Sequence, residues 1–181
     1  MRAFYPVCQV AELAAGYGYT TVMELSTRRV QIAGITPHPT AAFMQQCARQ
    51  LTDHCDGFLR AKRYLIHDRD TTFTAAFDQY LRDHGVEPVR MPPQSPNLHA
   101  HWERFVRSIK EEALDRMICM GEASLRYAIR WYLSHYHAER NHQGLDNQLI
   151  APGPEVGRTT GSVKRRDRLG GLLSYYYREA A

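Results

Sequence analysis

Two acidic residues, Asp68 and Glu103, carry the most chemical information in this chain. Asp68 directly follows the apolar run Tyr64-Leu65-Ile66-His67, and 34 residues separate it from Glu103, whose surroundings at 99–110 have the pattern of a helix. A carboxylate at a strand end and another on a later helix can converge on divalent metal ions, and two metal ions held in this way can cut and join phosphodiester bonds. Such a site needs a third carboxylate, for which the sequence offers no convincing candidate.

Each acid also has a simpler interpretation. An Asp that follows a strand is usually a turn residue or a cap, and Asp70 offers a second carboxylate in the same turn. Asp68 is preferred because it directly continues the apolar strand. Glu103 taken alone is an ordinary helical acid that pairs with Arg107 one turn later. His99, one turn before Glu103, adds only a weak transition-metal signal.

Two cations continue the helix face that carries Glu103. Arg107 and Lys110 follow it at positions i+4 and i+7. A metal-binding carboxylate flanked by cations suits a polyanion, because the acid would hold the metal while the cations bind phosphates outside the cleavage point. Carboxylate ligands favour hard cations, so the expected ion is Mg²⁺ or Mn²⁺.

The bulk composition indicates an ordinary globular protein. The chain has 181 residues, of which 44% are hydrophobic and 23% charged, and we expect one domain with a real core. No apolar run approaches the roughly 20 residues that cross a bilayer, and the first residues lack the pattern of a signal peptide. We therefore expect a cytoplasmic protein without a membrane partner. Its four cysteines form no CxxC pair, which argues against a zinc finger and favours buried free thiols.

The positive charge is concentrated at the C-terminal end. Residues 158–181 contain six bases and two acids, whereas residues 1–157 contain 17 of each, so the net charge of +4 lies entirely in the last segment. A basic segment of this kind predicts either a phosphate-binding arm or a solvated, disordered tail. Both interpretations stay open from the sequence.

The hydrophobic patterning predicts an α/β domain. The expected order is strand, strand, helix, strand, helix, strand, helix, helix, with nothing assigned to residues 1–16 and a Pro-rich loop at 91–98. This order favours a mixed sheet with helices packed on it. The segments are 17–25, 30–35, 40–54, 63–67, 74–84, 86–89, 99–119 and 122–140.

Several blocks, in the same order, resemble the integrase catalytic core of retroviral integrases and DDE-type insertion-sequence transposases. They are Glu24 to Val30, Tyr64 to Asp70 with Phe73, Pro93 to Asn97, Glu103-Arg104-Phe105 with Arg107 and Lys110, and Tyr136 to Leu145 followed by Pro152. The resemblance covers about Tyr19 to Pro154. It implies a ribonuclease-H-like mixed sheet flanked by helices, with a core at 17–157, an uncertain segment at 1–16 and a basic tail at 158–181.

The resemblance also implies an activity and its residues. In that family two Asp and one Glu hold two metal ions for cleavage and transfer of DNA strands. Asp68 matches the second Asp and Glu103 matches the Glu. The implied partners are the ends of a mobile element, its target DNA and at least one further copy of the chain. The implied DNA-binding residues are Arg107, Lys110, Gln94 and Asn97.

The first Asp of that pattern has no match. The spacing predicts it near Met1 to Tyr5, where no acid occurs. Glu12 lies in a segment of helical character, and Glu24 aligns with a second-strand acid. A truncated or disrupted first strand would explain the gap.

Three functions therefore stay open. The chain is expected to be a transposase-type polynucleotidyl transferase, a catalytically dead remnant that binds DNA or a sister subunit, or an unrelated small α/β nuclease.

Overall fold

The computed structural model describes the backbone of residues 6–12, 17–91 and 96–179 and the side chains of residues 17–91 and 100–179. The chain divides into two compact units, Met1–Val106 and Arg107–Ala181. Each unit is described by itself below. No helix in the described ranges is long and apolar enough to cross a membrane.

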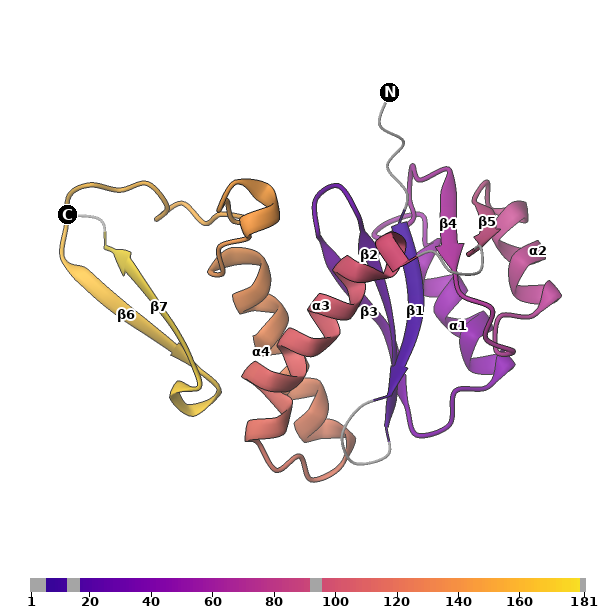
Figure 1. The fold of residues 1–181 in the computed structure, drawn as a ribbon, viewed down its shortest axis with the longest axis horizontal. Coiled ribbons are helices and arrows are strands. Elements are labelled where there is room, and N and C mark those ends of the chain that lie inside the picture. The colour runs from indigo at the N-terminus through magenta and orange to yellow at the C-terminus, as the bar shows by residue number, and fades with distance from the viewer. Residues whose placement is uncertain (1–5, 13–16, 92–95, 180–181) are drawn as a thin grey trace. The chain divides into compact units, whose positions relative to one another are not determined.

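The first unit is built on a five-stranded sheet with the spatial order β3-β2-β1-β4-β5 (Figure 1). β1 pairs antiparallel with β2, as β2 does with β3, while β4 runs parallel to both β1 and β5. The short β5 contains Pro88 and lies at the edge, where a residue without an N–H group is tolerated. The strands are β1 (Pro6–Glu12), β2 (Gly18–Glu24), β3 (Val30–Thr36), β4 (Tyr64–His67) and β5 (Glu87–Arg90).

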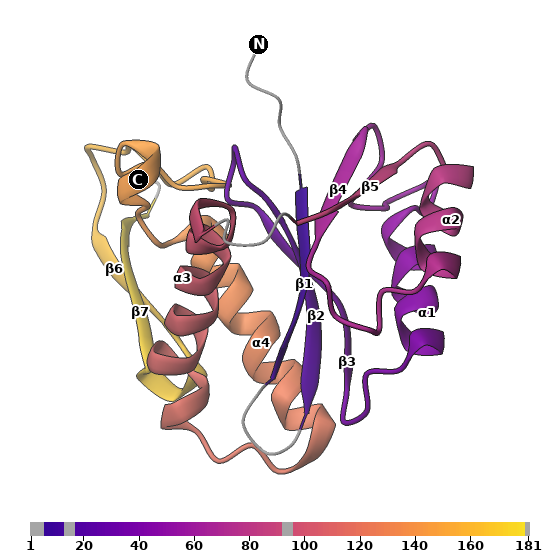
Figure 2. The ribbon, with the colours of Figure 1, turned by 45° about the vertical axis from the view of Figure 1, so that its right-hand side comes forward.

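Two capped helices pack side by side on this sheet (Figure 2). α1 (Ala41–Leu51) begins after Thr40 and α2 (Ala75–Asp83) begins after Thr74, and each threonine hydroxyl accepts a backbone N–H three residues on. Gly85, at φ 78°, follows α2 in a left-handed conformation that suits glycine. The helices bury an apolar core with β2, β3 and β4 that includes Val22, Ala33, Met44, Cys47, Leu51, Leu65, Phe77 and Leu81.

The second unit contains the end of α3 (Pro96–Glu112), a 3-10 turn at Leu114–Arg116, α4 (Gly121–Ala138) and a two-stranded hairpin. The hairpin pairs β6 (Val163–Arg168) antiparallel with β7 (Leu173–Arg178). The interpretation of residues 158–181 as a disordered tail is therefore wrong for most of this segment, because strand pairing within the hairpin and contacts with α4 hold it in a defined structure.

Glu139, just after α4, joins the hairpin to that helix. Its carboxylate is only 1% exposed. It accepts two hydrogen bonds from Arg168, at 2.7 and 2.9 Å, and one from Arg166 at 3.1 Å. His135 Nδ1 lies 3.0 Å from the same carboxylate. Burial acts to raise the pKa of Glu139, but the hydrogen bonds from Arg168, His135 and Arg166 outweigh it and lower that pKa.

Three local predictions are wrong. Residues 6–12, including Glu12, form a strand, because pairing with β2 and β4 on its two sides overrides a weak helical pattern. The helix expected over 99–119 ends at Glu112, since Ala113 leaves the helical backbone at φ −133°. Of the three cysteines whose side chains the structure describes, Cys47 alone is a buried thiol, because Cys55 is exposed and Cys119 is half-buried.

Candidate active site

Asp68 lies at the carboxyl end of β4, where it is half-buried. Its Oδ1 accepts the backbone N–H of Asp70 at 3.1 Å, and Asp70 Oδ1 in turn accepts the N–H of Thr72 at 2.8 Å. These bonds build a tight turn after the strand. Asp70 is exposed and further into the turn, which fits a structural role for that carboxylate and leaves Asp68 as the acid that continues the buried strand.

A buried chain of hydrogen-bonded side chains contacts the backbone of Asp68. His67 is fully buried, its Nε2 lies 3.0 Å from Asp78 Oδ1, and its Nδ1 lies 2.8 Å from the backbone oxygen of Asp68. Arg90 Nη2 donates to the other oxygen of Asp78 at 3.1 Å. These hydrogen bonds were not predicted from the sequence, although one signal was present. Asp78 lies on the stripe of positions 74, 77, 78 and 81 that faces the core, where an unpaired acid would be costly.

Glu103 is exposed on α3, and its neighbours attach the helix to the sheet. Trp102 Nε1 donates to Thr21 Oγ1 on β2 at 2.6 Å. His101 Nε2 lies 2.9 Å from the guanidinium of Arg28. The pKa of His101 is lowered, first by burial and then by the positive charges of Arg28 and Arg104.

Glu103 belongs to the first unit and Arg107 to the second, and the ion pair between them stays a prediction from the sequence. Arg107 is exposed and Lys110 half-buried, both on α3 within the second unit. Asn97 belongs to α3, but the structure describes only its backbone. Gln94 lies outside the described residues.

The sheet register shows which residues adjoin the end of β4. Cys8 of β1 pairs with His67, so the next position, Gln9, is level with Asp68. Gln9 also pairs with Thr21, the residue that Trp102 contacts. One row across three strands therefore links the helix that carries Glu103 to the strand end that carries Asp68. Adjacent strands lie about 4.8 Å apart, so this row is short.

Neither upstream acid completes the site. Glu12 lies three residues beyond Gln9, about 10 Å along the strand at about 3.3 Å per residue. Glu24 pairs with Pro6 at the other end of β1, and its carboxylate binds Lys62 and Thr27. Among the described histidine, cysteine, aspartate and glutamate side chains, no group of three could hold a metal ion.

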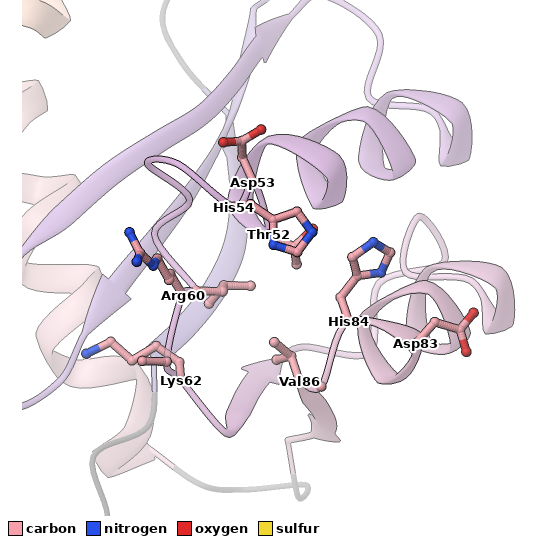
Figure 3. Close-up of a pocket in the computed structure, with 11 residues that line it drawn as sticks. Thr52, Asp53, His54, Arg60, Lys62, Asp83, His84 and Val86 are labelled. Carbon is pink, nitrogen blue, oxygen red and sulfur yellow. The ribbon is translucent and has the colours of Figure 1, made fainter.

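A cavity of about 580 Å³ lies at the opposite end of β4 (Figure 3). Lys62 and Arg60 line it from the segment before β4, and His54 and His84 line it after α1 and α2. Asp53 accepts the backbone N–H groups of Cys55 and Asp56, and these bonds lower the pKa of its carboxyl group. Because Asp68 follows β4 whereas Lys62 precedes it, this cavity is separate from the acidic site.

Comparison with known proteins shows a likeness to integrases in sequence over part of the chain and in fold over most of it. Residues 84–149 match the family model of the integrase core domain. The fold is similar to that of the catalytic core domain of BIV integrase, with 16% identity, a TM-score of 0.63, and coverage of 82% of this chain and 91% of that one. No curated protein matches the chain in sequence.

The catalytic core domain of HTLV-2 integrase in complex with magnesium is also similar. Its dimeric form is 10% identical with a TM-score of 0.60, and its trimeric form is 11% identical with a TM-score of 0.58. Both matches cover 82% of this chain and 93% of the other. At these identities the likeness establishes the fold, and it confirms the expected α/β class with ribonuclease-H-like similarity.

Proposed function

We infer that this chain is a polynucleotidyl transferase domain that acts on DNA in integration or transposition. The family match and the fold support this, because both indicate an integrase/transposase catalytic domain of the ribonuclease-H-like fold. The observation that carries the proposal is the position of Asp68. It directly follows the buried strand β4, level with the row of paired residues at which the helix that carries Glu103 contacts β2. Residues 17–157 would form the catalytic core.

The carboxylates present suit a single hard cation better than two. Mg²⁺ is commonly held by one or two carboxylates together with waters and substrate phosphates. Asp68 and Glu103 would supply those carboxylates, and the ion, Mg²⁺ or Mn²⁺, would activate the attacking oxygen and stabilise the leaving one. A second ion would lack a ligand, because the strand position level with Asp68 is Gln9 rather than an acid. We therefore expect weak activity.

Cleavage of supercoiled plasmid DNA in Mn²⁺ tests this proposal. Asp68→Asn and Glu103→Gln should each reduce nicking to background, because each removes a metal ligand. Asp70→Asn is the matched control, since that carboxylate serves the turn, and it should leave nicking within about twofold of the wild-type rate. Nicking that survives both substitutions would refute the assignment.

The register suggests a gain-of-function test. Gln9→Asp would place a third carboxylate on the central strand, level with Asp68. We expect this variant to bind Mn²⁺ more tightly and to nick DNA faster than the wild type. Val10→Asp, one residue further along, is the control, because neighbouring strand positions face opposite sides of the sheet. Equal behaviour of the two variants would contradict the proposed position.

The second candidate function is a catalytically dead subunit that binds DNA or assembles with active copies. This candidate is favoured because the position level with Asp68 is Gln9, which has no carboxylate. In this case DNA binding persists without metal and survives Asp68→Asn. In either case we propose Arg107 and Lys110 as phosphate contacts. Replacing either with Ala should weaken binding uniformly across DNA sequences and reduce the salt dependence by about one phosphate contact.

We also propose that Gln94 and Asn97 contact DNA. The proposal further includes a cytoplasmic location and self-association of the chain. The similar HTLV-2 core is described in dimeric and trimeric forms, and sedimentation equilibrium would show whether this chain also self-associates. A phosphate-binding role for residues 158–181 has weaker support, because four of the six bases there already contact acids. These are Lys164, Arg165, Arg166 and Arg168.

A further inference from the structure

We propose that His67, Asp78 and Arg90 form a positioning chain that fixes the direction of the Asp68 carboxylate. The inference rests on the proposed function, because Asp68 is taken as the metal ligand. None of the three residues is assigned a role by the integrase resemblance. His67 is fully buried and cannot touch DNA, so any contribution it makes must pass through its neighbour.

The positioning chain of side chains runs from the protein surface to the backbone of Asp68, the candidate metal ligand. Arg90 on β5 is 56% exposed and donates to Asp78 Oδ2 at 3.1 Å. Asp78 on α2 is 9% exposed, and its Oδ1 lies 3.0 Å from His67 Nε2. His67 Nδ1 lies 2.8 Å from the carbonyl oxygen of Asp68. Three elements, α2, β4 and β5, are thereby tied to one peptide group.

Both ring nitrogens of His67 face oxygen atoms, which fixes the ring. The ring also stacks on Phe73 with the ring centres 4.6 Å apart and meets Phe77 edge-on at 5.9 Å. A ring clamped at both nitrogens and on its face cannot rotate. The Asp68 carbonyl oxygen is therefore held in one direction, and the hydrogen bond from the N–H of Asp70 to Asp68 Oδ1 ties the carboxylate to the same turn.

Two further bonds hold the same turn to the end of β5. The N–H of Met91 donates to the carbonyl oxygen of His67 at 2.8 Å. Arg69 Nε donates to the carbonyl oxygen of Met91 at 3.1 Å. The residues on both sides of Asp68 are thus fixed to one neighbouring strand. Metal ligands whose supporting groups are removed typically lose affinity by about 10- to 100-fold.

A simpler interpretation is that His67 is only a satisfied core residue. Its replacement would then lower stability, because Asp78 Oδ1 loses a buried partner, but it would not change Mn²⁺ binding by the folded protein. His67→Phe makes this replacement. It keeps the ring between Phe73 and Phe77 and removes both polar contacts.

The experiment measures Mn²⁺ binding to the full chain by electron paramagnetic resonance, with thermal unfolding recorded in parallel. We expect His67→Phe to bind Mn²⁺ about 10- to 100-fold more weakly than the wild type. Arg90→Ala removes only the exposed member of the positioning chain, so the variant should fold, and it should weaken Mn²⁺ binding by about tenfold. DNA affinity measured without metal should not change in either variant.

Arg82→Ala is the matched control. Arg82 also connects α2 to β5, through Glu87 at 3.4 Å, but it does not contact the His67 chain. Its Mn²⁺ affinity should stay within about twofold of the wild type, since exposed ion pairs contribute little. Asp68→Asn supplies the second control, because in that background His67→Phe should have no further effect on Mn²⁺ binding.

The outcomes separate the two proposals. If wild type and Asp68→Asn bind Mn²⁺ equally, the metal site fails, and the positioning chain fails with it. If Asp68→Asn abolishes binding while folded His67→Phe and Arg90→Ala bind like the wild type, only the positioning chain is overturned. Equal losses from Arg82→Ala and Arg90→Ala would indicate a general effect of the α2–β5 connection and would also overturn it.

Discussion

Replacing Glu139 with Gln should destabilise the second unit strongly. The substitution keeps the size and the hydrogen-bonding oxygen of the side chain but removes its charge. Two guanidinium groups, from Arg168 and Arg166, then lose their shared carboxylate. Because this carboxylate joins α4 to the hairpin, the loss should be felt across both elements.

The exposure of each partner sets the magnitude. Glu139 is 1% exposed and Arg168 10% exposed, so their bidentate pair is sheltered from water. Breaking a buried ion pair by removing one partner typically costs about 3–5 kcal/mol. Arg166 is 37% exposed and can be solvated, and Gln still accepts one hydrogen bond. We therefore expect the lower end, about 3 kcal/mol, which lowers the melting temperature by about 6–12 °C for a chain of this length.

Urea unfolding followed by tryptophan fluorescence and circular dichroism measures this loss. Trp131 reports on the site, because the Arg168 guanidinium carbon lies 4.8 Å from the centre of its ring. The pKa of Glu139 is lowered in the folded chain from its ordinary value of 4.5. Its stabilisation is therefore fully present above about pH 4.5 and is lost as the pH falls through the folded-state pKa. The difference between wild type and variant should shrink accordingly in acid.

Glu122→Gln is the control on the same helix. Its carboxylate is 45% exposed and pairs with Arg126 at 2.6 Å, so its removal should change the free energy of unfolding by less than about 0.5 kcal/mol. A loss below about 1 kcal/mol for Glu139→Gln would refute the buried-pair reasoning. A difference that stays constant down to pH 3 would refute the assigned direction of the pKa shift.

Three further outcomes are expected. Iodoacetamide should alkylate exposed Cys55 in the native chain but reach Cys47 only on unfolding, because Cys47 is buried and this burial raises the pKa of its thiol to about 11. Mass spectrometry after timed quenching would show the order of alkylation, and equal rates would contradict the prediction. Thr40→Ala should cost about 1 kcal/mol in urea unfolding, since the N–H of Phe43 loses its cap at 3.2 Å, and a neutral result would refute that role. Gly85→Ala should cost about 1–2 kcal/mol because of its φ of 78°, although an added Cβ meets no atom within 4 Å; an unchanged urea midpoint would show that the backbone relaxes.

Local signals gave much of the first unit correctly. Thr40 and Thr74 cap their helices, and Gly85 follows α2, as the spacing of polar and apolar residues predicted. The alternation at 30–35 also marked a true strand. These features depend on contacts within a few residues, so the chain itself encodes them. β1 was missed because its pairing partners lie far away in the sequence and override its local preference.

The sequence alone proposed Asp68 and Glu103 as metal ligands and two cations on the helix of Glu103 as DNA contacts, and it predicted the kind of domain that carries them. Only the tertiary structure decided that Gln9 is level with Asp68, that His67 is clamped between Asp78 and a backbone carbonyl, and that a supposed tail is a hairpin bonded to Glu139. The physical reason is the range of the interactions. Caps and alternation act over a few residues, whereas strand register and buried hydrogen-bond chains join side chains that only folding brings together.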